Sequence, residues 1–332
     1  MPVLEITPPV ISTPREFKKG DCSATGIGGH IFFFHGNSTG RRHHASYYDL
    51  YVMDGNGCFP RLVMSEVSGS PAWSTDGKRL AVGCENNSFL CILDTKATLD
   101  TCTGSKREIG QCHPVVLQKF KLPLAIGGDE RMYNISWMSG DSQIAVEGGT
   151  EITHRYFVYL ISVNEEAWKI FIQGLAPFNM AWSPTDEQLA FSGLSFINLQ
   201  NPSVSVQGLY PEWSPDGKRI AFVKSSNDES REPYGIAVLN IAGGNWEWLY
   251  EPIFRDKRYY PPRNLVIRDD YHHRLLAWSP DMRYIAFVSE IALGAESHIF
   301  RLDTMTGVIV NLTADVKPSE GAPAFYAPAW GP

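Results

Sequence analysis

Two stretches of the sequence concentrate side chains that could recognise an acidic partner. One is Gly36–Ser46 with the tyrosines that follow it, and the other is Glu251–Arg274. Their candidate partner-binding residues are Arg41, Arg42, His43, His44, Tyr47, Tyr48, Arg255, Lys257, Arg258, Tyr259, Tyr260 and Arg263. Arginine pairs bidentately with carboxylates, and Tyr and Arg are enriched where binding energy concentrates. The pattern is also compatible with solvated loops whose charge is offset by Asp256, Asp269 and Asp270, and both interpretations remain open.

Signals for catalysis are weak in the same stretches. Gly36–Gly40 reads GNSTG and matches G-x-S-x-G, but that motif needs a helix after the serine, and a basic loop follows Ser38. The histidine pairs His43-His44 and His272-His273 could ligate a metal, yet adjacent side chains in a strand point to opposite faces. We therefore expect solvent-exposed loop histidines, no metal, no cofactor and no catalytic residue among them. No pattern in the sequence identifies a particular pair of carboxylates of the kind that glycosidases use.

The element that must position these loops is repeated along the chain. Tyr210–Val223 reads YPEWSPDGKRIAFV, an apolar lead-in, a Ser-Pro-Asp-Gly turn signal and an alternating run. Pro presets φ in the turn, Gly accepts a left-handed conformation, and period-two alternation is typical of a strand with one buried face. The stretch therefore predicts a β-hairpin.

Copies of this hairpin pattern occur throughout the sequence. They read PAWSTDGKRLAV, ISWMSGDSQIAV, MAWSPTDEQLAF and LAWSPDMRYIAF, and PAWGP ends the chain. The repeated tryptophans are Trp73, Trp137, Trp182, Trp213, Trp278 and Trp330, at spacings of 31 to 65 residues. A unit of this size made of short strands is typical of a propeller.

The two ends of the chain carry complementary incomplete copies. Three strands near residues 30–34, 48–54 and 59–64 have no Trp-bearing strand before them, and the strand at Trp330 has nothing after it. Pairing of these pieces would remove free edges. We predict an all-β fold: a six-bladed β-propeller of four-stranded antiparallel blades, closed by the two termini. Blades are expected to start near residues 70, 133, 179, 210 and 275, with 324–332 joining 30–64; residues 1–25 form a surface arm and 26–332 a single domain.

The repeats resemble those of the TolB-type β-propeller family, whose motifs are similar to WD repeats. WSPDGK occurs at Trp213, with WSTDGK at Trp73 and WSPD at Trp278 as near copies, and the likeness covers roughly residues 26–332. The resemblance implies the fold more firmly than the function, because propellers host many activities. TolB itself is periplasmic and has an N-terminal α/β domain that this sequence does not show, so TolB's own partners are not carried over.

Composition narrows the classes of partner. The formal net charge is −7, which excludes a general polyanion-binding character, so no nucleic acid is expected. No run approaches eighteen apolar residues, so no membrane insertion is expected. The first twenty residues lack a basic start and an apolar core, which predicts a cytoplasmic protein, or a periplasmic or secreted one if the chain is trimmed.

The six cysteines all lie in the first third of the chain. They are Cys22, Cys58, Cys84, Cys91, Cys102 and Cys112. None forms a CxxC pair, so a zinc site is not expected. Cys84 and Cys91 have the setting of small buried hydrophobes, and Cys102 and Cys112 could pair in an oxidising compartment. Without an export signal, we expect free thiols.

Together these patterns favour a non-enzymatic binding or scaffold module. It would recognise a protein or peptide at the loop-rich mouth of the propeller, where ring closure makes the two basic stretches neighbours. The alternative is a hydrolase or lyase that acts on a small ligand or carbohydrate in the central channel. A deep polar channel would favour the enzyme, and a shallow mouth with exposed Tyr and Arg would favour the binding module.

Overall fold

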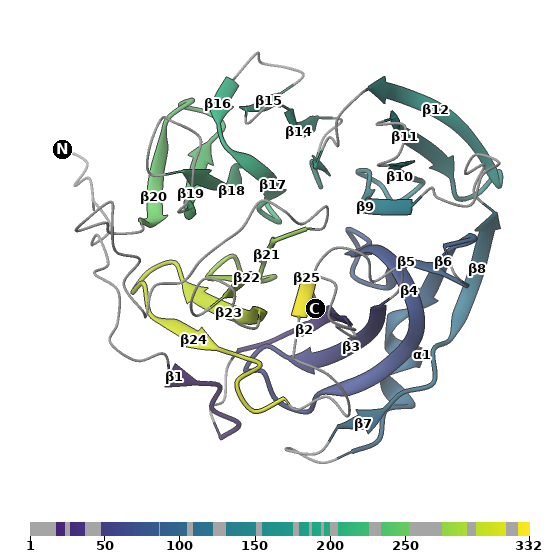
Figure 1. The fold of residues 1–332 in the computed structure, drawn as a ribbon, viewed down its shortest axis with the longest axis horizontal. Helices are drawn as coiled ribbons and strands as arrows, with labels where there is room; N and C mark the ends of the chain where they lie inside the picture. Colours follow the sequence, from purple (N-terminus) through teal and green to yellow (C-terminus); the bar gives the residue numbers. More distant parts are fainter. Residues whose placement is uncertain are drawn as a thin grey trace.

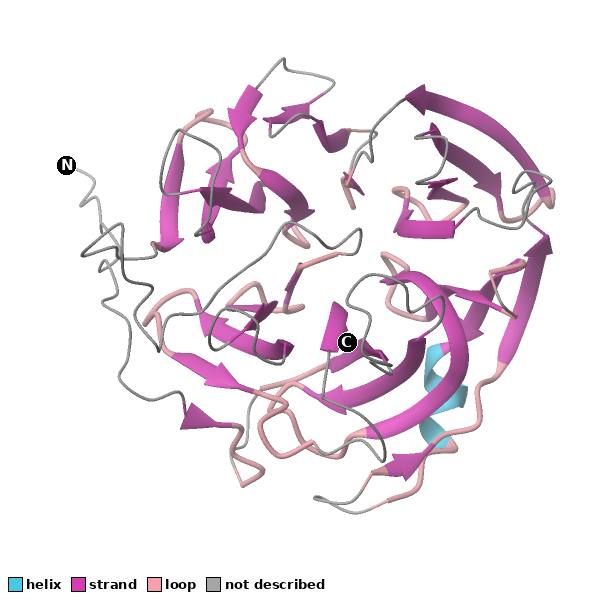
Figure 2. Ribbon diagram, viewed as in Figure 1, coloured by secondary structure: helices cyan, strands magenta, loops and turns pink. Residues whose placement is uncertain are grey.

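The architecture is a set of β-sheets arranged around a common centre in a computed structural model (Figure 1). The described residues are 18–23, 27–36, 48–85, 87–104, 109–121, 131–150, 155–174, 179–185, 188–193, 196–199, 205–225, 234–251, 274–290, 297–316 and 325–332. Within them the regular structure is almost all strand, and the exception is one short helix, α1 (Thr95–Asp100), on the periphery (Figure 2). The expectation of an all-β chain without a long helix is confirmed for these residues.

Three sheets are four-stranded antiparallel meanders that follow the chain in order. The first contains β9 (Arg131–Trp137), β10 (Gln143–Thr150), β11 (Arg155–Ser162) and β12 (Ala167–Gly174). The second contains β13 (Met180–Trp182), β14 (Leu189–Gly193), β15 (Phe196–Leu199) and β16 (Ser205–Gln207). The third contains β17 (Leu209–Trp213), β18 (Arg219–Ser225), β19 (Tyr234–Asn240) and β20 (Trp246–Tyr250). The Trp-bearing lead strands β9 and β17 lie nearest the centre of their sheets (Figure 1).

A fourth sheet adds a strand from the N-terminal part of the chain. Its meander is β21 (Leu276–Trp278), β22 (Tyr284–Glu290), β23 (Ser297–Asp303) and β24 (Ile309–Asn311). The outer edge of β24 is paired in parallel with β1 (Lys18–Lys19). The described part of the predicted surface arm is therefore attached to the sheet, while the division into an arm and one domain stays a prediction.

The fifth sheet is eight-stranded and joins the two ends of the chain. It contains β25 (Phe325–Gly331), β2 (His30–Gly36), β3 (Tyr48–Asp54), β4 (Arg61–Trp73), β5 (Arg79–Cys84), β6 (Phe89–Asp94), β8 (Val116–Lys121) and β7 (Gly110–Gln111), which runs along β4. Trp330 lies opposite Ile31, so the predicted pairing of the C-terminal strand with the strand at His30 is confirmed. β4 is longer than the predicted strand, because its first half pairs with β3 and its second half with β5.

The hairpin turns behave as their residues predict. Ser214 Oγ donates to Asp216 Oδ1 at 2.6 Å, and the Arg219 amide donates to Ser214 Oγ at 3.0 Å. Gly217 takes φ of 68°, the left-handed conformation that closes the turn. In the copy at Trp278, Met282 occupies the glycine position and takes φ of 59°, so the turn geometry is kept without glycine.

The repeated tryptophans fasten neighbouring sheets to one another. Each of four indole Nε1 atoms donates to the carbonyl just before the Trp of the preceding repeat: Trp73 to Ala329, Trp137 to Ala72, Trp213 to Ala181 and Trp278 to Glu212, at 3.0–3.1 Å. Trp330 Nε1 donates instead to Gly28 O at 3.2 Å. Trp182 Nε1 is buried and has no hydrogen-bond partner. Indole hydrogen bonds thus link four of the repeats to the preceding one, whereas Trp182 and Trp330 do not make this link.

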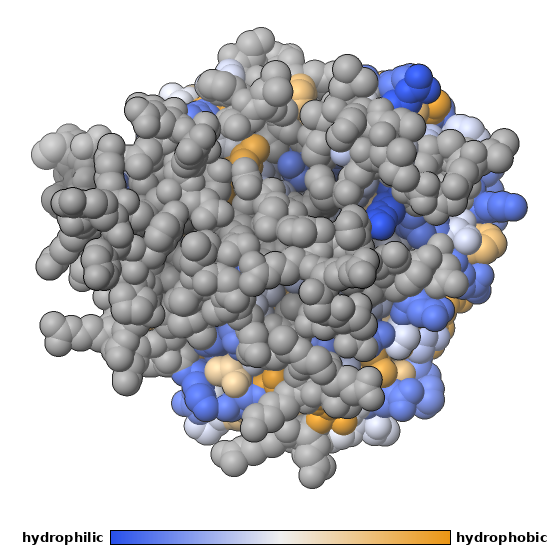
Figure 3. Space-filling view, viewed as in Figure 1, coloured by the Kyte–Doolittle hydropathy of each residue, from blue (hydrophilic) through white to orange (hydrophobic). Residues whose placement is uncertain are grey.

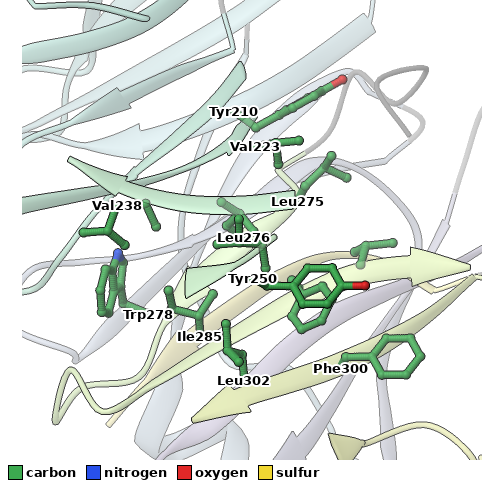
Figure 4. Close-up of a cluster of buried hydrophobic side chains, with 14 of the residues drawn as sticks. Tyr210, Val223, Val238, Tyr250, Leu275, Leu276, Trp278, Ile285, Phe300 and Leu302 are labelled. Atoms are coloured by element: carbon green, nitrogen blue, oxygen red, sulfur yellow. The ribbon is translucent and has the colours of Figure 1, made fainter. Parts of the chain in front are cut away.

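Apolar side chains fill the space between adjacent sheets. Figure 4 shows such a cluster, in which Val238 and Tyr250 of the third meander lie against Trp278, Ile285 and Phe300 of the next sheet. Tyr250, Phe287 and Phe300 are fully buried. Burial of a large apolar side chain contributes roughly 1.5–3 kcal/mol, so the contacts between sheets are a main source of stability.

The expectation of free thiols is wrong. All six cysteines pair, as Cys22–Cys58, Cys84–Cys91 and Cys102–Cys112. The pairing of Cys102 with Cys112 was considered from the sequence for an oxidising compartment. Cys84 and Cys91 come together because β5 and β6 are neighbouring strands. Cys22 and Cys58 come together because β1 brings the N-terminal segment to the loop after β3. Sequence spacing alone cannot specify such pairings.

Candidate functional site

The predicted partner-binding residues fall mostly in segments whose placement is not described. Arg41, Arg42, His43, His44, Tyr47, Arg255, Lys257, Arg258, Tyr259, Tyr260 and Arg263 lie outside the described residues. Tyr48 is described and is half-buried; its ring stacks on Phe34 at 5.3 Å and meets Tyr326 edge-on at 5.7 Å. Tyr48 therefore packs partly in the sheet, and its role in partner binding stays a prediction.

The described residues that flank the two basic stretches do lie at one end of neighbouring sheets. Gly36 pairs with Tyr48, and the adjoining His35 pairs with Phe325 at the start of β25. Arg274 leads into β21, whose Ala277 belongs to the same buried cluster as Phe325. Since inner strands of successive repeats run in the same direction, the starts of β21 and β25 lie on the same face. This face is opposite to the Ser-x-Asp turns.

A central cavity opens on the other face, where the inner strands converge. It has a volume of about 310 Å³ and is lined by all six repeated tryptophans together with residues of the hairpin turns, among them Ser74, Pro184, Pro215 and Pro280. Four of the six indole N–H groups are already committed to the carbonyls of neighbouring repeats. The six indoles line the cavity, yet polar and apolar atoms share its exposed surface about equally.

One ion pair marks the inner end of this cavity. Arg274 Nε lies 3.3 Å from Glu212 Oε2, and the two side chains are only 13% and 17% exposed. Arg274 Nη2 also donates to Ile135 O at 2.9 Å, and its backbone amide donates to Ser70 Oγ at 2.9 Å. Arg274 thus links three sheets across the centre. On its far side lies a void of about 10 Å³ beside Asn134 and Asn179, enough for about one water molecule.

Glu212 is the titratable group of the cavity. Burial raises the pKa of Glu212 to about 6, and the charge of Arg274 acts in the opposite direction. A carboxyl with such a pKa can exchange a proton near neutral pH, which is a property of acid–base sites and also of structural ion pairs. Among the side chains of the described residues that line the cavity, Glu212 carries the sole carboxylate and Arg274 the sole cationic group. A pair of carboxylates for glycoside hydrolysis is therefore not formed by the described lining.

Carboxylates outside the cavity stabilise the hairpin turns. Burial would raise the pKa of Asp216, but hydrogen bonds from Ser214 and the Lys218 amide outweigh it and lower that pKa. Asp141 accepts hydrogen bonds from the amides of Thr75 and Asp76 at 2.7 and 2.9 Å. These acids stabilise hairpins and the contacts between them, which is a structural role.

Other chemistry considered from the sequence finds no support within the described segments. Groups of three or more His, Cys, Asp or Glu that could hold a metal ion are absent from these residues. Ser38 and the histidine pairs at 43–44 and 272–273 lie outside the described residues. Searched over the same residues, the chain has no helix long and apolar enough to cross a membrane.

One feature of the sequence distinguishes Glu212 from the equivalent residues of the other repeats. The residue just before each repeated Trp is small in five copies: Ala72, Ser136, Ala181, Ala277 and Ala329. The fifth repeat has Glu212 at this position. A charged residue at a position that is Ala or Ser in the other repeats indicates that this repeat has a different local environment. The partner, Arg274, was visible only as one more cation of a basic stretch.

Comparisons with known proteins support the fold. The sequence matches no family model and no curated protein. TolB from Acinetobacter baumannii aligns over 92% of this chain and 67% of its own, with a TM-score of 0.60 and 16% identity. An oligogalacturonate lyase from Vibrio parahaemolyticus aligns over 84% and 78%, with a TM-score of 0.46 and 11% identity. The β-propeller domain of Cps50 (Swd1) from Myceliophteria thermophila aligns over 82% and 85%, with a TM-score of 0.45 and 10% identity. The likeness to TolB concerns the fold alone, and with the arrangement of sheets it shows that this chain is a β-propeller.

Proposed function

We propose that the sheets form a six-bladed ring closed by β25 and β2. The eight-stranded sheet would supply two blades, since β4 pairs with β3 along one half and with β5 along the other. The four meanders would supply the rest. In this arrangement the blade of β21–β24 is followed by the blade that begins with β25, which makes the two basic stretches neighbours.

On this ring, the proposed function is that of a non-enzymatic binding or scaffold module. Its partner is a protein or peptide with acidic side chains, bound at the mouth formed by Gly36–Ser46 and Glu251–Arg274. The observation that carries the proposal is the placement of described residues beside these stretches: Gly36 pairs with Tyr48 in the sheet that contains β25, and Ala277, three residues after Arg274, packs in one buried cluster with Phe325 of β25. Loops on a rigid scaffold are a usual place for binding residues.

Charge supports an acidic partner. The chain carries a formal net charge of −7, yet eight Arg and Lys residues lie in these two stretches, against four Asp and Glu residues. Basic groups on an acidic protein favour encounter with acidic segments in one orientation, and the attraction weakens with salt. The association should therefore be slower and weaker at high ionic strength.

The compartment that fits the proposal is an oxidising one. Three disulfides join all six cysteines, and disulfides persist in periplasmic and extracellular proteins but are rare in the cytosol. The cytoplasmic expectation rested on the N-terminal sequence alone. We therefore propose a periplasmic or secreted protein.

A charge-reversal experiment tests the binding surface. The variant Arg41→Glu, Arg42→Glu, Arg258→Glu is compared with a matched control, Lys78→Glu, Lys96→Glu, Lys218→Glu, which makes the same change in charge elsewhere on the molecule. All three control lysines are exposed. After circular dichroism shows an unchanged fold, partners are captured from the source organism and their affinities measured at two salt concentrations. The proposal expects loss of partners for the first variant only, and equal binding by both variants and wild type contradicts it.

The second candidate is a hydrolase or lyase in the central channel. The cavity of about 310 Å³ and the raised pKa of Glu212 favour it, whereas the ion pair with Arg274 and the absence of a second carboxylate in the described lining do not. Binding or turnover of a small ligand that is lost in Glu212→Gln and retained in the Arg41, Arg42, Arg258 variant would favour this candidate over the binding module.

A further inference from the structure

β12 is an edge strand with an unusually apolar exposed surface. It lies at the end of the β9–β12 sheet, on the rim of the molecule (Figure 1), and among the described strands it pairs with β11 alone. Residues 167–171 are all exposed, and within them Trp168 and Ile170 are 48% and 52% exposed. On the face seen in Figure 3, hydrophobic and hydrophilic atoms of described residues lie side by side along this part of the rim. An exposed edge of this kind presents backbone N–H and C=O groups that another strand can pair with.

The outer strands of the other sheets are shorter than β12 or are accompanied by a further strand. β24 is covered by β1, and β4 is accompanied by β7. β16 has only three residues, and β8 carries Lys119 and Lys121. β20 carries Glu247, and its Trp246 lies under the Lys224 ammonium at 4.7 Å. Short length, added lysines and covering strands are the usual means by which proteins block edges. β12 has eight residues and a single charge, Lys169.

A β-bulge interrupts the pairing of β12 with β11, but it does not cover the outer edge of β12. The register with β11 passes from Ile172 opposite Val158 to Ile170 opposite Tyr159, so Phe171 is the extra residue. The Phe171 ring lies 5.8 Å from that of Trp182 in the next sheet. A bulge re-aims a side chain and increases local twist. Phe171 is turned toward Trp182, while Trp168 and Ile170 remain available at the edge.

The charges around β12 are arranged as a self-complementary pair. Glu165 and Glu166 precede the strand and are exposed at one end. Arg155 is exposed at the other end, since the neighbouring Tyr156 pairs with Gly174. Two copies of β12 placed side by side in antiparallel orientation bring the acidic end of each to the Arg155 end of the other. A parallel placement would set like charges together, which is unfavourable.

We propose that a second copy of this chain docks on β12 through antiparallel pairing of the two strands, which forms a two-fold symmetric dimer. With the axis near Ile170, Trp168 faces Ile172 of the second copy, and Lys169 faces Phe171, so no lysine faces a lysine. An interface of this type uses the same patch on both copies. The sheets β9–β12 of the two copies become one continuous sheet, and the exposed apolar side chains are buried.

The oligomeric state and one substitution test this dimer. Light scattering after gel filtration, over a series of protein concentrations, should give twice the chain mass for wild type. Ile170→Lys should raise the dimer dissociation constant by about a hundredfold or more, because Ile170 faces its own counterpart near the axis and the substitution sets two lysines opposite each other. The matched control is Leu117→Lys: Leu117 is 50% exposed on the outer strand β8 and lies outside the proposed pairing. It should leave the dimer intact.

A charge exchange tests the orientation and does not depend on the behaviour of Ile170→Lys. Arg155→Glu should weaken the dimer, and its combination with Glu165→Arg and Glu166→Arg should restore it, because all three changes recreate the antiparallel attraction. A wild type that is monomeric at every concentration overturns the proposal. Equal dissociation constants for Ile170→Lys and Leu117→Lys, or no restoration by the exchange, also overturn it.

Discussion

The part of the molecule near residues 18–121 and the part near residues 131–250 hold the same repeated hairpin in different ways. The first, which we call the disulfide-linked region, contains all three disulfides and the sheet in which the chain ends meet. The second, the disulfide-free region, contains three separate meanders that contact one another through side chains. Its joints include the hydrogen bond from the Trp213 indole to Ala181 O at 3.1 Å, and the buried pair of Glu212 with Arg274 connects it to the segment that leads into β21.

The three disulfides do not span the junction between the chain ends, because they join residues only 36, 7 and 10 positions apart within the first third of the chain. A ring assembled from repeats has one junction where the first and last pieces meet, and that junction has the greatest separation along the chain: Ile31 faces Trp330. Contacts of large sequence separation are costly in chain entropy. The disulfide-linked region lies at this junction, while the disulfide-free region joins repeats that are neighbours in sequence.

The largest effect expected is from deletion of residues 324–332. The deletion removes β25, exposes the edge of β2 and eliminates Trp330, which stacks on Tyr284 and is buried. Loss of the Trp330 side chain alone would cost about 3–5 kcal/mol. Thermal unfolding with light scattering should show a lower melting temperature and self-association through the exposed edge. A truncated chain that stays monomeric with the full-length melting temperature would contradict the role of β25.

Within the disulfide-free region, an inner tryptophan should matter far more than an outer one. Trp213 is 5% exposed and donates a hydrogen bond to the neighbouring sheet, whereas Trp246 is 38% exposed on the outer strand β20. Trp213→Ala should lower the free energy of unfolding by about 3–5 kcal/mol. Trp246→Ala should cost much less, and Trp248→Ala on the same outer strand provides a second comparison. Urea titration measures all three, and similar losses would mean that inner and outer strands contribute equally.

The disulfide-linked region can be probed by removing its bridges singly. Cys22→Ser with Cys58→Ser opens a link with a sequence separation of 36, and Cys84→Ser with Cys91→Ser opens one with a separation of 7. The first pair should cost about 2–4 kcal/mol and the second less, because a longer closed loop restricts the unfolded chain more. Urea titration of both variants gives the order, and the reverse order would show that native contacts outweigh loop length.

The smallest effect is the pH dependence contributed by Glu212. Its pKa is raised to about 6 in the folded protein by burial, above the ordinary value of 4.5. The folded state therefore binds more protons than the unfolded state between these values, and the contribution of Glu212 to stability falls as pH rises through this window. The unfolding free energy of wild type relative to Glu212→Gln should decrease by at most about 2 kcal/mol from pH 4.5 to pH 6.5. A difference that stays constant or increases with pH would show that Arg274 outweighs burial.

The sequence by itself determined the repeated unit and the layering of strands. The Ser-Pro-Asp-Gly signal and the alternation after it are local patterns, and the structure has the expected turn at Gly217 and the expected inner strand at Trp213. The complementary chain ends also predicted the pairing of the strand at Trp330 with that at His30, because an unfinished repeat must find its missing part. Such features follow from period and turn chemistry, which depend on neighbours in the chain.

Tertiary structure decided what joins the repeats. The partners of Cys22 and Cys58, the ion pair between Glu212 and Arg274, and the free edge of β12 depend on which residues of distant repeats meet in space. Hydrophobic alternation does not encode these meetings, because many pairings bury the same apolar faces. The three-dimensional arrangement selects one of them, and with it the cavity, the bridges and the exposed edge.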